Sequence, residues 1–296
     1  MSEFIAKNLP YLLAGISVGG QYALIAIGYT MVYGILRLIN FAHGDVFMAA
    51  GLVIVYLTAT GLPYYVTIPL VILATVLLGV LIERMAYKPL RSAPRMSVMI
   101  SAIGVSYLLE NCALYFTGGL PKIYPKIPFL SDSVTIFGCA TSRVTVITPI
   151  IVAVLVLVLV ILIRYTKVGM AMRAVSKDFT TAQLMGIKIN SVISYTFVIG
   201  CALAAIGSLL YFSNYSSVIP TSGAMPGLKA FVAAVFGGIG SIPGAVVGAF
   251  IIGICENIIK GLGYTTFSDA FTFVLLIVVL AVKPTGIFGE KTTDKV

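Results

Sequence analysis

The sequence predicts an all-α, polytopic integral membrane protein, a bundle of about eight (7–9) transmembrane helices with broken or re-entrant segments. Of its 296 residues, 59% are hydrophobic and only 10% are charged, whereas soluble domains carry about 25% charged residues. The mean hydropathy is +1.08. Long apolar runs leave no room for a soluble domain, so residues 1–296 are expected to form a single transmembrane domain.

The apolar runs define the expected spans in order. The first run, residues 11–36, is too long for the core of a signal peptide and is expected to be a retained span. A shorter run at 46–60 follows, and the remaining continuous runs are residues 64–82, 97–117, 144–163, 192–212 and 267–282. Glycines and a proline interrupt residues 227–259, which are expected to form either a re-entrant pair of half-helices or two short spans.

Basic residues are concentrated in two loops, which indicates the orientation of the chain. One loop holds Arg84, Lys88, Arg91 and Arg95, and the other holds Arg164, Lys167, Arg173, Lys177 and Lys188. Cytoplasmic loops carry such an excess of Lys and Arg, so both are expected inside, and the charge does not indicate a nucleic-acid site. Residues 118–143 then form an external loop, and the tail 283–296 lies inside. The side of the N-terminus stays open.

Residues that support enzyme or cofactor chemistry are scarce. His43 is the sole histidine. Cys112, Cys201 and Cys255 lie in apolar runs and Cys139 in a loop, and all four cysteines are expected to be small buried hydrophobes. We therefore predict no enzyme, catalytic residue, metal site or cofactor. The sequence has no Gly-Lys pair and so no phosphate-binding loop. If nucleotide powers this protein, the ATPase is another chain.

Polar residues interrupt the apolar stretch that follows the first span. Asn40, His43 and Asp45 stand there within six residues. Burying such groups near lipid is costly, so they are expected to face a cavity or other protein groups. One interpretation is a broken helix that lines a pathway; the other is a short cytoplasmic turn.

A second interruption is rich in glycine. The segment contains Gly237, Gly238, Gly240, Ser241 and Gly244, together with a proline. Such a segment cannot continue a helix, and it permits a tight reversal of the backbone. Broken helices often mark translocation pathways. A plain tight hairpin packed against a neighbour is the alternative.

The second basic loop, residues 165–190, is expected to contain a helix. Its Ala, Met, Arg, Gln and Leu residues are good helix formers, and Gly186 is expected to end the helix. Such a helix docks on a partner protein or lies on the acidic surface of membrane lipid. The residues alone leave both possibilities open.

Two acidic-amide pairs, Glu110-Asn111 and Glu256-Asn257, lie in or near apolar segments. They indicate either a polar seam inside the bundle or an interfacial position. The interfacial alternative is favoured, with Glu256 paired to Lys260 one turn on. A secondary transporter driven by an ion gradient would instead place carboxylates such as Asp45, Glu110 or Glu256 at mid-membrane.

Three segments carry a resemblance to a known family. They run from Ile39 to Asp45 (Ile-Asn-Phe-Ala-His-Gly-Asp), from Arg173 to Ile187, and from Lys229 to Gly244, which ends in Gly-Gly-Ile-Gly-Ser-Ile-Pro-Gly. Over nearly its whole length the chain resembles the permease subunits of ABC importers for branched-chain amino acids, and the shorter of the two permeases most closely. One departure lies in the loop, where Ala174-Val-Ser stands in the place of the family's Glu-Ala-Ala.

The resemblance implies a mechanism and a set of partners. Two permeases, usually a heterodimer, would form the pore in a bacterial or archaeal inner membrane, two cytoplasmic ATPases would power it, and an external solute-binding protein would deliver leucine, isoleucine or valine. Relatives that transport urea or short amides leave those substrates open. The implied coupling residues are Gly169, Arg173, Ala174, Asp178, Ala182, Leu184 and Gly186. The implied pathway residues are Asn40, His43, Asp45, Gly237, Gly238, Gly240, Ser241 and Gly244.

Overall fold

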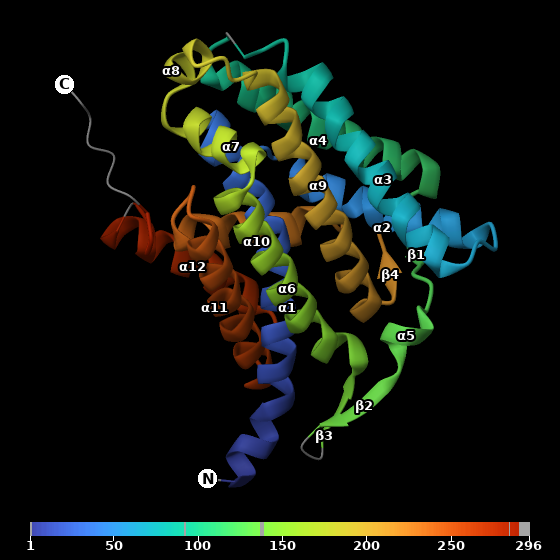
Figure 1. Cartoon of the computed structure of the whole chain (residues 1–296). Coiled ribbons are helices and arrows are strands. Elements are labelled where there is room, and N and C mark those ends of the chain that lie inside the picture. Colours follow the sequence, from blue (N-terminus) through green and yellow to red (C-terminus); the bar gives the residue numbers. More distant parts are fainter. Residues whose placement is uncertain (1, 92, 137–138, 284, 290–296) are drawn as a thin grey trace.

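The computed structural model describes residues 2–91, 93–136, 139–283 and 285–289, and it is largely helical (Figure 1). Six helices are long and apolar enough to cross a membrane, and three shorter apolar helices accompany them. This set confirms the predicted all-α membrane bundle. Lys291 and Lys295 of the tail and the side chain of Cys139 lie outside the described residues.

The apolar helices of the described residues fall into a long set and a short set. The long ones are α1 (Ser2–Leu36), α3 (Tyr64–Ile82, continued by the π-helical turn η1, Glu83–Tyr87), α4 (Arg95–Thr117), α6 (Arg143–Tyr165), α9 (Ile189–Asn214) and α11 (Ile242–Gly261). The shorter ones are α2 (His43–Ala59), α10 (Ala224–Gly237) and α12 (Phe267–Val282).

Small elements complete the two ends of the bundle. At one end lie α5 (Pro128–Ser131) and the strands β1 (Lys122–Ile123), β2 (Ser133–Ile136), β3 (Cys139–Ser142) and β4 (Ser217–Val218). β1 pairs with β4 and β2 pairs with β3, both antiparallel. At the other end lie α7 (Lys167–Lys177) and α8 (Phe179–Leu184).

Glycine brings α1 and α11 into close contact at the centre of the bundle. A Cβ atom built on Gly19 would lie 2.8 Å from the Cα of Phe250, and one built on Gly253 would lie 2.4 Å from the Cα of Gly19. Gly15 meets the backbone of Ile254 in the same way. Close backbone approach of this kind drives helix association in lipid, where the hydrophobic effect between helices is absent. Gly15 and Gly19 therefore form a helix-packing face on α1.

The surface of α4 and α6 is strongly apolar. Tyr107 and Leu108 of α4 and Ile150 and Leu157 of α6 are exposed, as lipid-facing or partner-facing side chains must be. Cys112 is exposed on α4, whereas Cys201 is buried between α9 and α3. The expectation that Cys112 is buried was therefore wrong, because the outward face of a membrane helix needs no burial to accept a small apolar residue.

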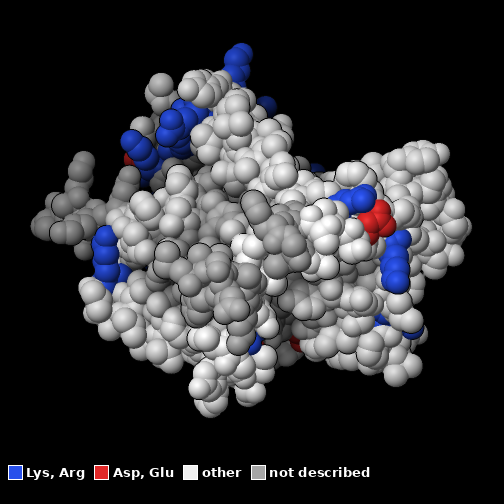
Figure 2. Space-filling model, turned by 90° about the horizontal axis from the view of Figure 1, so that it is seen from below, with Lys and Arg blue, Asp and Glu red and all other residues white. Residues whose placement is uncertain are grey.

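The two basic loops lie at the same end of the molecule, where Arg91 donates a hydrogen bond to Asn190. The N-terminus lies at the opposite end (Figure 1), where Tyr11 packs on Gly261. If the basic loops are cytoplasmic, as their charge predicts, this arrangement predicts an external N-terminus. Figure 2 views the molecule from this N-terminal end and shows acidic and basic side chains as separated groups on a largely uncharged surface.

Candidate functional site

The chain leaves helical geometry between α1 and α2. Arg37 has a positive φ of 54°, which is uncommon for a residue with a side chain, and α2 begins only at His43. Asn40, His43 and Asp45 are all buried, with exposures of 2%, 2% and 3%. A solvated cytoplasmic turn does not fit this burial, whereas a broken helix inside the bundle does. We refer to residues 37–42 as the α1–α2 break.

Each of the three polar residues has a different environment. The Tyr87 hydroxyl donates to Asn40 Oδ1 at 2.8 Å. The His43 ring stands edge-on to Tyr29, with centroids 5.1 Å apart, and its Nε2 has no hydrogen-bond partner in the described part of the chain. A Cβ on Gly28 would lie 2.1 Å from that nitrogen, so the histidine fills the space left by a glycine. His43 therefore packs inside the bundle.

Asp45 lines an open cavity of about 290 Å³ between α2, α4 and α10, whose rim includes the exposed side chains of Tyr107 and Leu228. Its carboxylate accepts a hydrogen bond from Ser106 Oγ at 2.5 Å, and Glu110 one turn further along α4 lines the same cavity. Phe41 and Phe231 contribute an apolar wall. No Lys or Arg belongs to the described lining, so the cavity offers carboxylate oxygens beside aromatic and aliphatic surface. We refer to it as the Asp45 cavity.

The amino-terminal ends of α2 and α10 meet at this cavity. Gly44 lies so close to α10 that an added Cβ would be 2.7 Å from the carbonyl oxygen of Gly223 and 3.1 Å from the Cα of Gly227. Glycine is required because two backbones touch here. The region 227–259 thus forms a pair of helices, α10 and α11, and the start of α10 packs against the start of α2.

The glycine-rich turn between α10 and α11 lies away from the Asp45 cavity. Gly238 and Gly240 have φ angles of 105° and 98°, which only glycine adopts easily. Ser241 Oγ caps α11 by accepting from the Gly244 amide at 3.2 Å. Phe288 donates its backbone amide to the Gly237 carbonyl at 2.9 Å. The turn therefore packs on the C-terminal segment, and of the predicted pathway residues Asp45 alone reaches the cavity.

The second basic loop folds into two helices, so the expectation of a single helix was wrong. Asp178 separates them with extended backbone, and its carboxylate accepts from the amides of Thr180 and Thr181 at 2.8 and 3.2 Å. A side chain that caps new amides competes with continuation of the first helix. The Thr181 hydroxyl and these amides hold the pKa of Asp178 below its usual range. Gly186, with a φ of 81°, ends α8, which confirms the predicted stop.

The remaining loop residues divide into anchoring and exposed groups. Gly169 lies against the Ile163 carbonyl with no room for a Cβ, and Arg173 donates to that carbonyl. Ala182 is buried, whereas the side chains of Leu184 and Met185 are exposed by 82% and 78%. Ala174 is partly buried on α7. Two exposed apolar side chains on a basic cytoplasmic loop are typical of a surface that a partner covers.

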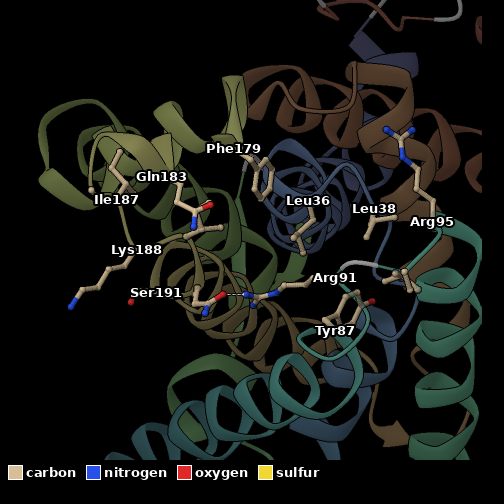
Figure 3. Close-up of a pocket in the computed structure, with 15 residues that line it drawn as sticks. Leu36, Leu38, Tyr87, Arg91, Arg95, Phe179, Gln183, Ile187, Lys188 and Ser191 are labelled. Carbon is tan, nitrogen blue, oxygen red and sulfur yellow. Dashed lines mark hydrogen bonds between the residues drawn. The ribbon is translucent and has the colours of Figure 1, made fainter. Parts of the chain in front are cut away.

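A larger cavity, of about 990 Å³, lies at the end of the bundle that carries the basic loops, which are predicted to be cytoplasmic (Figure 3). Phe179 and Gln183 of α8 line one side of it, and Leu36 and Leu38 at the end of α1 line another. Arg91 lies at its border. We refer to it as the cytoplasmic cavity.

Comparison with known proteins gives the family. The model of the family described as branched-chain amino acid transport system / permease component matches residues 11–280. The chain belongs to this family. It is 40% identical to the high-affinity branched-chain amino acid transport system permease protein LivH of Escherichia coli K12 over 100% of both chains. It is 38% identical to the BraD permease protein of Pseudomonas aeruginosa over 99% of both, and 28% identical to a probable LivH of Methanocaldococcus jannaschii over 90% of this chain and 88% of that protein.

Membership in this family makes the chain a multi-pass permease of the inner membrane, and the family is one of transport proteins, not enzymes. The predicted resemblance is confirmed. The matches do not assign individual residues, so the coupling and pathway residues named above remain predictions about this permease.

The permease also contains a buried ionic cluster that the sequence pattern did not indicate. Glu256, 1% exposed, accepts from Lys260 at 2.5 Å, from Lys229 at 2.8 Å and from the Tyr22 hydroxyl at 3.1 Å. Lys229 also pairs with Asp269 at 2.6 Å. The predicted pairing of Glu256 with Lys260 is confirmed. The carboxylate is also buried in the bundle, where Lys229 inside the apolar run of α10 neutralises it.

Proposed function

We propose that this permease is the membrane subunit of an ATP-driven importer for branched-chain amino acids, and that it forms part of the translocation path. The observation that carries the proposal is similarity along the entire length to permeases named for high-affinity branched-chain amino acid transport. Since the sequence lacks a phosphate-binding loop, ATP must be hydrolysed by other subunits.

The size and lining of the Asp45 cavity suit a small zwitterionic substrate. Its volume, about 290 Å³, lies at the lower end of the range of small-molecule sites. The carboxylates of Asp45 and Glu110 suit an α-ammonium group, and the aromatic wall suits a short aliphatic side chain. Urea and short amides carry no positive charge, so they make less use of these carboxylates.

The cytoplasmic loop supports coupling to an ATPase. α7 is anchored to α6 through Gly169 and Arg173, so force applied to the loop reaches the membrane helices. Leu184 and Met185 present exposed apolar surface next to the turn at Gly186. In the proposed assembly this permease pairs with a second, different permease, two ATPases bind the cytoplasmic loops, and an external solute-binding protein delivers the amino acid.

The proposal is tested by purifying the chain from its own cells in mild detergent and identifying by mass spectrometry what remains bound. Recovery of a second permease and of ATPases with phosphate-binding loops is the expected result. Recovery of this chain alone, still able to accumulate solute when reconstituted with only an ion gradient, would refute the proposal. Asp45 and Glu110, which share one cavity, would then be the first candidates for ion coupling.

A further inference from the structure

Arg91 joins the two cytoplasmic basic loops. Its guanidinium donates one hydrogen bond to Asn190 Oδ1 (Figure 3). It donates another to Glu83 Oε1. Asn190 lies in the first turn of α9, directly after the turn at Gly186 that ends α8. Arginine presents a planar fork of donors that holds two acceptors in fixed directions. The end of the coupling loop is therefore fastened to the end of α3.

Glu83 is the buried member of this arrangement. It is 1% exposed, and its second carboxylate oxygen accepts from Ser194 Oγ at 3.1 Å. It opens the π-helical turn η1, in which the Lys88 amide donates to the Glu83 carbonyl at 2.8 Å. π-helical turns are rare and occur frequently at functional sites. Because a buried carboxylate is costly to leave unpaired, Glu83 must follow any displacement of Arg91.

Tyr87 closes the same turn and reaches the α1–α2 break. Its hydroxyl donates to Asn40 Oδ1 at 2.8 Å, and its ring packs on Phe197 with centroids 5.3 Å apart. The Asn40 carbonyl in turn accepts from the amide of His43, the first residue of α2, at 3.1 Å. Asp45, two residues on, lines the Asp45 cavity. Side-chain hydrogen bonds at both ends of η1, joined by its backbone, thus connect the coupling loop to the start of the helix that carries Asp45.

We propose that Arg91, Glu83 and Tyr87 are positioning residues that transmit displacement of the coupling loop to the α1–α2 break and so reshape the Asp45 cavity. This inference rests on the proposed function, since the displacement originates in the ATPases. The cytoplasmic cavity lies between α8 and the end of α1, so within the coupling loop it is α7, more than α8, that contacts α1 directly. The hydrogen-bonded route through η1 is the stiffer connection, because paired buried charges and packed rings deform less than an open space.

The decisive variant is Tyr87→Phe, which keeps the ring and its packing on Phe197 and removes only the hydroxyl. In proteoliposomes holding the complete transporter, ATP hydrolysis and its stimulation by the loaded binding protein should stay at the wild-type level. Leucine taken up per ATP hydrolysed should fall about five-fold, the equivalent of one lost hydrogen bond. Arg91→Lys should behave alike, since an ammonium group cannot reproduce the two-pronged contact.

The matched control is Tyr56→Phe, which removes a hydroxyl that donates to the Phe116 carbonyl at 2.9 Å at the external end. This variant should couple normally. In a double-mutant cycle, Tyr87→Phe combined with Asn40→Ala should be no worse than the more severe single variant, because both break the same bond.

Two results would overturn the relay: wild-type uptake per ATP in both Tyr87→Phe and Arg91→Lys, or losses that multiply in the double variant. If Tyr87→Phe does not fold, leucine uptake per ATP hydrolysed by Arg91→Lys tests the relay in its place. A wild-type transporter that hydrolyses ATP without taking up any branched-chain amino acid would instead overturn the proposed function, and the relay with it.

Discussion

Replacing Gly44 with alanine tests whether the contact between α2 and α10 shapes the site. The new Cβ would lie 2.7 Å from the Gly223 carbonyl oxygen and 3.1 Å from the Gly227 Cα, where ordinary contact begins at 3.4 Å. Both obstacles are backbone atoms, so no side-chain rotation relieves the clash and α10 must move. Overpacking of this kind costs about 1–3 kcal/mol. Because Gly44 and Gly227 both line the Asp45 cavity, the movement should also change its shape.

The matched control is Gly104→Ala on α4, where an added Cβ meets nothing within 4 Å. Alanine is the better helix former by about 1 kcal/mol, so this variant should be neutral or slightly more stable. The assay compares apparent melting temperature in detergent and leucine uptake by the reconstituted transporter. Gly44→Ala should lower both, while Gly104→Ala should lower neither. Equal melting temperatures and equal uptake in the two variants would refute the packing argument.

Four further predictions follow from single sites. Asp45→Leu should slow leucine uptake, because it removes the carboxylate from the cavity. Gly186→Val should leave ATP hydrolysis intact and abolish coupled uptake, since valine resists the φ of 81° that ends α8. Lys229→Met should destabilise the fold by about 3 kcal/mol, because Glu256 loses a buried partner. Asp178→Ala should speed amide hydrogen exchange in α8. The folded state lowers the pKa of Asp178 below its ordinary value of about 4. Its cap should therefore stabilise α8 fully above pH of about 4 and be lost as the pH falls through the lowered, folded-state pKa.

Each of these predictions has its own control. Gly263→Val introduces the same strain at a φ of 94° on the external side and should transport normally; equal defects in both valine variants would count against a coupling role for Gly186. Lys260→Met removes a partly exposed partner of the same carboxylate and should cost less than Lys229→Met. Asp178→Asn keeps an acceptor and should protect α8, and fast exchange in that variant would contradict the cap. Wild-type uptake by Asp45→Leu would remove Asp45 from the pathway.

The fold was largely predictable because its determinants are local. The lengths of the apolar runs predict the spans, and the basic loops predict their orientation. Gly186 predicts the end of its helix because glycine readily adopts the positive φ found there. The polar residues between Arg37 and Asp45 indicated a break because their burial in lipid would be costly. Direction of the first span was not predictable, since few charges flank it.

The site was less predictable because its contacts join distant parts of the chain. Ser106 lies 61 positions from Asp45, and Lys229 lies 27 positions from Glu256. Nothing in the local sequence of either partner indicates the other. The glycine-rich turn was read as a pathway candidate from its backbone freedom, but that freedom also suits a turn packed on the C-terminal segment, where Phe288 bonds to Gly237. Both segments interrupt apolar runs, yet only the one that holds Asp45 lines the Asp45 cavity, and the glycine-rich turn does not.

The most direct test of the account is uptake of labelled leucine by proteoliposomes containing this permease, its partner permease and both ATPases, with loaded binding protein outside, ATP inside and no ion gradient. The account predicts accumulation that requires ATP and is competed by isoleucine and valine. Accumulation of leucine by this chain alone, driven by an ion gradient and indifferent to ATP, would contradict it.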